Sequence, residues 1–286
     1  MPVQILAVSD TIDQRIHSAS LAERMPDIDL ALSCGDLPGR YLEFIIDALN
    51  RPLYYVLGNH AEELQRDEHG RPRGPLGCID IGGRVVMDER TGLILAGLPG
   101  SPKYNSSEPE QYTEWEMSLK IAKMTPRLLW NKRRYGRALD VLVTHSPPLD
   151  LGDRDDEAHR GFQAIRTFLE RFKPAYHLHG HVHLYDRSQS PVLCYDETTI
   201  INVYPYQALE ISVPEAHPIT TPPTSGTARS IRQQSAASSS GVFDPLRVEG
   251  RGQFGTASAF EIVPDRMTDR GRGTSREGLQ QVSARR

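Results

Sequence analysis

Four of the ten histidines of this 286-residue chain stand at alternate positions of one short segment, residues 177–183. In an extended backbone, residues i and i+2 face the same side, so His181 and His183 should project together. Two imidazoles this close together are typical of a metal site. Gly180 suits a sharp bend at the end of a strand. The alternative is a strand end whose histidines form only hydrogen bonds, and the other predicted strands help to decide between the two.

Metal-binding residue types also follow four other predicted strands. They are Asp10, Asp36, the pair Asn59 and His60, and His145. The carboxyl ends of strands in an α/β sheet meet on one edge, where sites form. Carboxylate, amide oxygen and imidazole ligands together suit Mn²⁺, Fe²⁺ or Zn²⁺. The set is large enough for two divalent ions that share a carboxylate, an arrangement that can activate a water and neutralise a phosphoryl group.

Strands and helices alternate along the chain, which predicts an α/β fold. In the first half, strands are predicted at Val3–Val8, Asp29–Cys34 and Leu53–Leu57, and helices near Leu21–Arg24 and at Tyr41–Asn50. Three further strands, at Cys78–Ile81, Arg84–Asp88 and Leu93–Leu98, indicate a mixed sheet. The second half is predicted to hold strands at Leu139–Thr144, Ala175–Leu178, Pro191–Tyr195, Thr199–Val203 and Ala208–Val213, with a helix at Phe162–Phe172.

The segment Gln111–Tyr135 has helical periodicity, and Pro126 is predicted to kink or break it. Its apolar residues are predicted to form a stripe that faces the core: Trp115, Leu119, Ala122, Leu128 and Leu129. The segment Ala61–Gly77 is polar and reads as a long loop, in which His69 is expected to be solvated.

Composition bounds the class of protein. No apolar run is long enough to cross a membrane, and no leader precedes the first strand, so we expect a cytoplasmic protein without a membrane partner. The three cysteines Cys34, Cys78 and Cys194 are unclustered and are expected to be buried small residues. Residues 1–213 carry a net charge of −7, which disfavours nucleic acid as a partner.

The composition changes after Val213. Residues 214–286 contain ten Arg and no Lys against seven acidic residues, and Ser, Gly, Pro and Gln are abundant. Such a segment buries too little apolar surface to offset the entropy of ordering, so we predict a disordered tail after a folded domain of residues 1–213. Within the tail, Phe254–Val263 is apolar enough to serve as a docking segment for a protein partner.

These motifs, in this order, resemble those of the calcineurin-like metallophosphoesterases. The family pattern is Asp-x-His, Gly-Asp, Gly-Asn-His, His and Gly-His-x-His. The chain has Ser9-Asp10, Gly35-Asp36, Gly58-Asn59-His60, Thr144-His145 and Gly180-His181-Val182-His183. The resemblance covers roughly Val3–Val213. It implies a four-layer α/β/β/α sandwich of two mixed sheets.

The resemblance also implies a role for each matching residue. Asp36 would bridge two divalent ions, one of which Asn59, His145 and His181 would also bind. Asp10 and His183 would bind the second ion. His60 would lie beside the leaving-group oxygen as an acid or transition-state stabiliser.

The first motif departs from the family pattern, because Ile12 stands where the family has a histidine. The second ion would therefore lack a ligand and bind weakly. Asp13, His17 or His159 could replace it, although Asp13 is equally typical of a turn or helix cap and His17 of a surface. A second departure is Ala61, where the family often has an acid that orients the histidine before it. Glu62 or water could take that part.

Two functions follow from these residues. The first is metal-dependent hydrolysis of a phosphoric ester, and the second is a scaffold of the same fold whose degraded metal site supports partner binding. The acidic body favours a small phosphate ester over a long polyanion. The loops predicted to border a substrate are Ala61–Gly77, Gly100–Pro109 and Asp150–His159, with Tyr104, Asn105 and Arg154 as candidate contacts.

Overall fold

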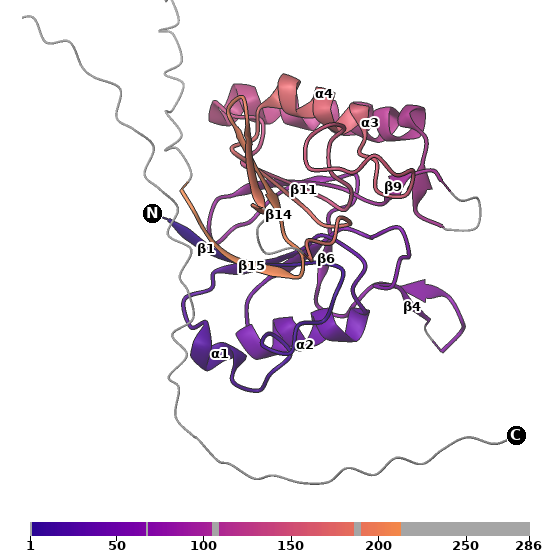
Figure 1. The fold of residues 1–286 in the computed structure, drawn as a ribbon. Helices are drawn as coiled ribbons and strands as arrows, with labels where there is room; N and C mark the ends of the chain where they lie inside the picture. The colour runs from indigo at the N-terminus through magenta and orange to yellow at the C-terminus, as the bar shows by residue number, and fades with distance from the viewer. Residues whose placement is uncertain (1, 67, 105–108, 186–189, 213–286) are drawn as a thin grey trace, which may run out of the picture. The chain divides into compact units, whose positions relative to one another are not determined.

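The computed structural model describes residues 2–66, 68–104, 109–185 and 190–212. Two β-sheets lie face to face, and helices cover the outer face of each (Figure 1). The predicted α/β/β/α sandwich of two mixed sheets is confirmed. The predicted tail, residues 214–286, and its segment Phe254–Val263 lie outside the described residues, so the domain boundary stays a prediction.

The first sheet has five strands in the order β15-β1-β2-β3-β6. Their bounds are β15 (Tyr206–Ile211), β1 (Val3–Val8), β2 (Leu30–Ser33), β3 (Leu53–Tyr55) and β6 (Ile79–Asp80). Strands β1, β2, β3 and β6 run parallel, and β15 pairs antiparallel with β1 at one edge. The helices α1 (Leu21–Arg24) and α2 (Gly39–Leu49) cover its outer face (Figure 1).

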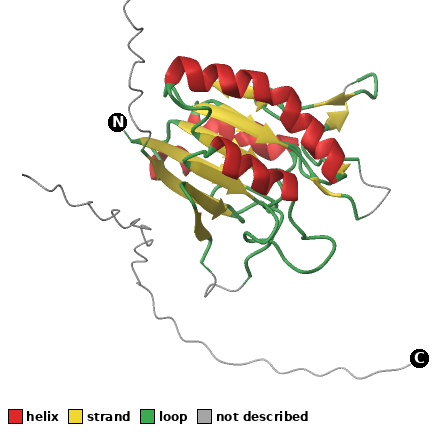
Figure 2. Cartoon of the chain, turned by 90° about the horizontal axis from the view of Figure 1, so that it is seen from above, coloured by secondary structure: helices red, strands yellow, loops and turns green. Residues whose placement is uncertain are grey.

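The second sheet has six strands in the order β13-β14-β12-β11-β8-β7. Their bounds are β13 (Val192–Tyr195), β14 (Thr198–Asn202), β12 (Tyr176–His179), β11 (Val141–Thr144), β8 (Ile94–Leu98) and β7 (Val85–Met87). The four central strands are parallel, and β13 and β7 are antiparallel edges. Helices α3 (Glu114–Tyr135) and α4 (Gln163–Phe172) pack on it side by side (Figure 2).

Two short ribbons complete the described elements. Strands β4 (Gln65–Arg66) and β5 (Pro72–Arg73) pair within the segment that was predicted to be all loop. Strands β9 (Ser101–Pro102) and β10 (Gln111–Tyr112) pair just before α3. The helix therefore begins three residues after the predicted start at Gln111.

Strand periodicity explains the layers. In β1, Ile5 and Ala7 point into the apolar core between the sheets, whereas Leu6 and Val8 pack under α1 and α2. A third core, between the second sheet and its helices, contains Phe162 and Phe168. Because both faces of each sheet are covered, the central strands read as continuous apolar runs, as parallel strands usually do.

Helix α3 corrects two predictions. The helix is not broken at Pro126, and it has strong ends: a capping box between Thr113 and Glu116, and Gly136 in the left-handed conformation after the last turn. A kink at Pro126, the other predicted outcome, stays a prediction. The predicted core stripe is also wrong apart from Leu128. The buried residues are Met117, Met124, Leu128 and Asn131, while Trp115, Leu119, Ala122 and Leu129 are exposed. The helix has apolar stripes on two opposite faces, and periodicity alone cannot tell which one meets the sheet.

Two smaller expectations are settled by burial. Cys34 is buried and Cys78 partly so, but Cys194 is exposed, so the expectation of three buried cysteines is wrong for Cys194. No helix within the described part of the chain combines the length and apolar character that a bilayer crossing needs.

The two faces of α3 give a direct test. Replacing buried Leu128 by Ala leaves a cavity against the sheet and should lower the free energy of unfolding by about 2–5 kcal/mol. Replacing its neighbour Leu129, which is half exposed, by Ala should change it by less than about 0.5 kcal/mol. Urea unfolding of both variants measures the difference. Equal losses would mean that both faces are buried.

Candidate metal centre

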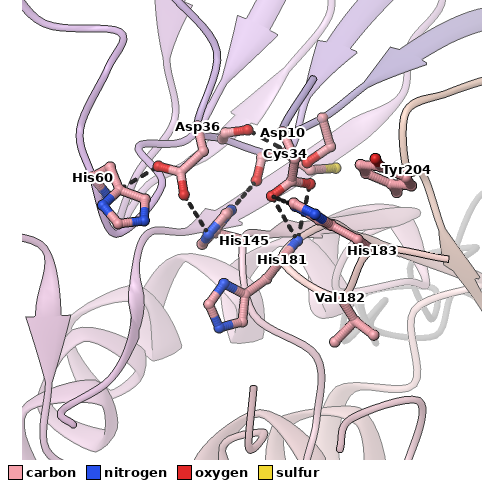
Figure 3. A network of polar contacts seen from close by, with 12 residues as sticks. Asp10, Cys34, Asp36, His60, His145, His181, Val182, His183 and Tyr204 are labelled. Atoms are coloured by element: carbon pink, nitrogen blue, oxygen red, sulfur yellow. Dashed lines mark hydrogen bonds and ion pairs between the residues drawn. The ribbon is translucent and has the colours of Figure 1, made fainter. Parts of the chain in front are cut away.

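The carboxyl ends of four central strands meet at one edge of the sandwich. Asp10 follows β1 and Asp36 follows β2 in the first sheet, while His145 follows β11 and His181 follows β12 in the second. Side-chain donor atoms of Asp10, Asp36 and His145 all lie within 4.8 Å of one another (Figure 3). Two carboxylates and an imidazole at this spacing form a donor set that suits a divalent ion.

The backbone at these strand ends is unusual. Asp10, Asp36 and His181 have φ angles of 61°, 56° and 66°, in the left-handed region that residues with a Cβ seldom occupy. Each such residue costs on the order of 1 kcal/mol or more and persists only where its surroundings hold it. Three such residues at one edge of the sandwich lower the stability of the fold, and in return they turn toward the same place.

Glycines allow the close approach of these turns. A Cβ on Gly58 would lie 2.0 Å from Oδ1 of Asp36, and a Cβ on Gly180 would lie 1.8 Å from Oγ of Ser9 and 2.5 Å from Oδ2 of Asp10. Neither position has room for any larger residue. The glycines of the Gly-Asn-His and Gly-His-x-His motifs are therefore required by packing against the two aspartates.

Asp36, Asn59 and His145 form the buried half of the site. Nε2 of His145 lies 3.1 Å from Oδ2 of Asp36 and 2.8 Å from Oδ1 of Asn59. The other ring nitrogen, Nδ1, lies 2.8 Å from the carbonyl oxygen of Cys34 and donates to it. Nε2 is thus the atom that His145 presents to the acidic centre. The backbone N–H of His60 donates to Oδ1 of Asp36 at 2.9 Å.

Charges in this half compensate one another. Burial alone would lower the pKa of His145, but the negative charges of Asp36 and Asp10 outweigh burial and raise it to about 9. Burial likewise opposes ionisation of Asp36, yet the charge and hydrogen bond of His145 keep the pKa of Asp36 below its ordinary value. The fold therefore stabilises carboxylate anions here only because a positive charge stands beside them.

Tyr104 fixes the orientation of Asn59. Nδ2 of Asn59 donates to the Tyr104 hydroxyl at 3.2 Å, which leaves Oδ1 of the amide turned toward His145. Tyr104 is held in turn by Gln111, whose side-chain oxygen accepts its backbone N–H at 3.2 Å. The sequence predicted Tyr104 as a substrate contact, and the structure places its hydroxyl on the side-chain amide of Asn59. Asn105 lies outside the described residues.

Asp10 and His183 form the second, more open half. Nε2 of His183 lies 3.7 Å from Oδ1 of Asp10. The His183 ring is stacked on Tyr204 with centroids 4.3 Å apart, and its Nδ1 is 2.8 Å from the Tyr185 hydroxyl. Burial alone would raise the pKa of Asp10. The interactions with His183 and His145 outweigh the effect of burial and hold the pKa of Asp10 below its ordinary value.

His181 joins the two halves through different atoms. Its backbone N–H donates to both carboxylate oxygens of Asp10, at 3.1 and 3.0 Å. Its ring lies beside His145, with centroids 4.8 Å apart, and its Nε2 donates to the carbonyl oxygen of Ala158 at 2.6 Å. Burial and the charge of His145 lower the pKa of His181 to about 3, so the ring is neutral. Because Nε2 carries the proton, Nδ1 keeps a lone pair that can bind a metal.

The other two histidines of the stretch have structural parts. Oγ1 of Thr144 donates to the Ser146 carbonyl at 2.6 Å, so it accepts a hydrogen bond from Nε2 of His177, 2.8 Å away. Burial lowers the pKa of His177 well below its ordinary value and that of His179 to about 4. Both are neutral and lie inside the sheet system. The hydrogen-bonded alternative is thus right for these two, whereas metal binding by His181 and His183 stays a prediction.

A sequence profile of the calcineurin-like phosphoesterases matches residues 3–185, which is more than half of the chain. The chain belongs to this family. The matched range includes every strand end described above, from Asp10 to His183. The predicted resemblance is therefore confirmed.

Individual relatives are more distant. The UPF0046 protein K07C11.7 of Caenorhabditis elegans is 27% identical over 225 residues, which cover 70% of this chain and 69% of the relative. The UPF0046 protein T07D4.2 of the same organism is 32% identical over 124 residues, or 40% of this chain and 28% of the relative. One solved crystal structure matches with a TM-score of 0.50 at 14% identity, covering 73% of this chain and 95% of its own, and supports the fold.

The phosphoesterase pattern is incomplete at position 12, and the structure places the three candidate replacements. Asp13 is bound to Arg15 through its side chain at 2.8 Å, as a turn residue would be. His17 packs edge-on against Tyr41 and Phe44 on the outer side of the first sheet. His159 lies near the site, with its ring centroid 5.2 Å from that of His181, but its Nδ1 is 2.7 Å from Oδ1 of Asp156.

The loop Asp150–His159, predicted to border a substrate, lies beside the candidate site. Besides the Ala158 carbonyl, which receives the proton of His181, Arg154 donates from Nη2 to the His183 carbonyl at 2.5 Å. The loop is therefore tied to both histidines of the Gly-His-x-His motif. Arg154 was predicted as a substrate contact, and its described bond is to the protein backbone.

Sequence reasoning missed Glu63. Its side chain is fully buried next to the Gly-Asn-His turn, where Oε1 accepts the backbone N–H of Leu37 at 3.2 Å. Oε2 has no hydrogen-bond partner among the residues that the structure describes. Burial raises the pKa of Glu63 to about 7. By anchoring the residue after Asp36, Glu63 supports the turn that carries it. Glu62, predicted to orient His60, is exposed, and burial followed by the charge of Asp36 raises its pKa.

The pKa of Glu63 predicts a pH-dependent stability. The unfolded chain loses this proton near its ordinary pKa of 4.5, whereas the folded chain keeps it until pH about 7. Folding stability should therefore fall as the pH rises from about 4.5 to 7, by about 1.4 kcal/mol per unit of pKa difference at most. Glu63→Gln should flatten this fall, measured by urea unfolding across that range. The exposed residue Glu157 supplies the control Glu157→Gln, and identical pH slopes in both variants would contradict the assignment.

Proposed function

We propose that this protein is a metal-dependent phosphoesterase that hydrolyses a small phosphoric ester. The observation that supports this most is the convergence of Asp10, Asp36 and His145 at the edge where both sheets end. The chemistry of this donor set fits a divalent ion, and the neighbouring Asn59 and His181 have donor atoms oriented by their own hydrogen bonds. Charge balance supports the same proposal. The two carboxylates raise the pKa of His145 to about 9, and the same negative charge would attract a divalent ion.

The residues would be shared between two ions. Asp36 would belong to both, with Asn59, His145 and His181 completing one site. Asp10 and His183 would serve the other, which would be weaker because Ile12 offers no ligand. Mn²⁺, Fe²⁺ and Zn²⁺ suit this mixture of oxygen and nitrogen donors. Bound ions of this kind supply positive charge to the phosphoryl oxygens and lower the pKa of a nearby water.

The protein's own groups would do the remaining work. His60 is exposed beside Asp36, and its backbone N–H fixes one carboxylate oxygen. From that position its ring would give a proton to the departing oxygen of the ester, because the leaving group departs more readily as a neutral alcohol than as an alkoxide. Tyr104 would keep the Asn59 amide turned toward the metal, and the Ala158 carbonyl would do the same for His181.

The wider setting is proposed on composition. An acidic body of residues 1–213 favours a small phosphate ester over a polyanion such as nucleic acid. A location in the cytoplasm is part of the proposal. A protein partner bound through the tail remains part of the proposal.

A scaffold that uses the same fold is the second candidate, and Ile12 favours it. A protein that only binds partners has no need of an acid at the leaving group, however, and His60 is retained. The turn that carries His60 is also supported by the buried carboxyl of Glu63. We therefore place hydrolysis first.

Catalysis can be tested with an activated aryl phosphate. A chelator should abolish turnover, and added Mn²⁺ should restore it. His60→Gln should reduce kcat by roughly 10²–10⁴-fold while the metal content stays near that of the wild type, since His60 contributes a proton and no ligand atom. His69→Gln, in the exposed segment before β5, is the matched control and should be silent. Wild-type protein that retains metal but hydrolyses no ester in a broad panel would favour the scaffold instead.

The asymmetry of the two sites can be tested by metal titration. Wild type should bind one equivalent tightly and a second weakly, so activity should keep rising well past the first equivalent. Ile12→His should tighten the second site by about 10-fold or more, given that even outer-shell changes alter affinity on that scale. Ile12 is 36% exposed, so the larger polar ring should not disturb the core. Two equally tight equivalents in both proteins would show that another residue, such as His159, already completes the site.

A further inference from the structure

Helix α3 presents an apolar stripe to solvent on the face opposite the sheet. Trp115, Leu119 and Leu129 are 71%, 41% and 50% exposed, and Ala122 and Pro126 lie between them. The spacing of these five residues, i, i+4, i+7, i+11 and i+14, keeps them on one side of a helix. Trp130 borders the stripe and is also exposed. Large apolar side chains in such a continuous row mark an interaction surface more often than a chance exposure.

The charged residues of the same helix are mostly basic. Its basic residues are Lys120, Lys123, Arg127, Lys132, Arg133 and Arg134, and its acidic residues are Glu114 and Glu116. The body to which it belongs is acidic, with a net charge of −7 over residues 1–213. With six basic and two acidic residues, the helix has a net charge of +4 within this acidic body. An apolar stripe with Trp and Leu, bordered by Lys and Arg, is the composition of helices that lie in the plane of a membrane surface.

The helix also has a suitable place in the fold. It is 22 residues long, and it lies on the outer layer of the sandwich beside α4 (Figures 1 and 2). A second copy of the chain is a poorer occupant, because pairing two such helices would bring twelve basic residues together against four acidic ones. Anionic lipid headgroups complement the helix, and Trp prefers the boundary between headgroups and acyl chains.

We propose that the solvent face of α3 binds the surface of a membrane that contains anionic lipid. The apolar stripe enters the headgroup region, and the flanking lysines and arginines contact lipid phosphates and carboxylates. Binding of this kind needs no membrane-spanning segment. The proposal therefore revises the expectation of no membrane partner, which rested on the lack of a spanning segment. The proposal is independent of the metal centre and holds whether or not the protein is a phosphoesterase.

Intrinsic fluorescence offers a direct test, because the chain has two tryptophans, Trp115 and Trp130, and both lie on this helix. The full-length protein is mixed with vesicles of phosphatidylcholine, with or without phosphatidylserine. We expect a blue shift of the emission and co-sedimentation with the mixed vesicles alone, both weakened by salt. No shift with the mixed vesicles would overturn the proposal.

Matched variants separate insertion from charge. Leu119→Ser should weaken vesicle binding about tenfold, whereas Leu193→Ser on β13, where the leucine is also 41% exposed, should not. Lys123→Gln with Lys132→Gln should weaken it about fivefold for each charge removed, while Arg90→Gln in an exposed loop should have little effect. Near-native melting temperatures are expected for all, since every changed side chain is exposed.

Two results would contradict the proposal outright. If Leu119→Ser and Leu193→Ser bind vesicles alike, the stripe does not enter the membrane. If the tryptophan shift depends on protein concentration without lipid, and ultracentrifugation shows a dimer that Leu119→Ser dissociates, a second copy covers the face instead.

Discussion

The candidate metal centre depends on a backbone constraint: strand ends from two different sheets must bring the carboxylate and imidazole residues that follow them to one point. The chain meets it by placing Asp10, Asp36 and His181 in the left-handed conformation, Asp10 two residues after β1 and the other two directly after a glycine. Gly58 and Gly180 then leave room for the two carboxylates, which a Cβ at either position would meet at 2.5 Å or less. These strained backbone conformations persist because three apolar cores hold the strands on both faces of the sheets.

Electrostatics follows from that convergence. Two carboxylates and several imidazoles brought this close together, largely out of water, cannot keep their ordinary pKa values. In the described structure a proton on His145 offsets Asp10 and Asp36, while His177, His179 and His181 are neutral. One positive charge against two negative ones leaves the centre attractive to cations. The surrounding carbonyls of Cys34 and Ala158 decide which ring nitrogen of His145 and His181 faces that centre.

The sequence predicted the strands and their polar ends well, because β-strand runs and the residues after them are local signals. It could not tell which apolar stripe of α3 meets the sheet, since Leu128 and Leu129 have the same chemistry and differ only in direction. Pro126 failed as a breaker because the helix ends and the sheet outweigh one hydrogen bond. Glu63 and the partnership of Asn59 with Tyr104 were not predictable, because they depend on side-chain contacts made by the tertiary structure.

The two halves of the candidate centre differ in rigidity, and in the proposed function they also differ in the number of ligands. Around Asn59 and His145 the side chains are buried, and Tyr104 and the Cys34 carbonyl hold them from behind. His183, in contrast, is one-third exposed at its side chain, and the Tyr185 hydroxyl that holds its Nδ1 belongs to a largely exposed residue. Ordering His183 around an ion therefore costs more conformational entropy than ordering His145. In the proposed two-ion centre, Ile12 would leave the less fixed half one ligand short, so both effects would weaken binding of the same ion.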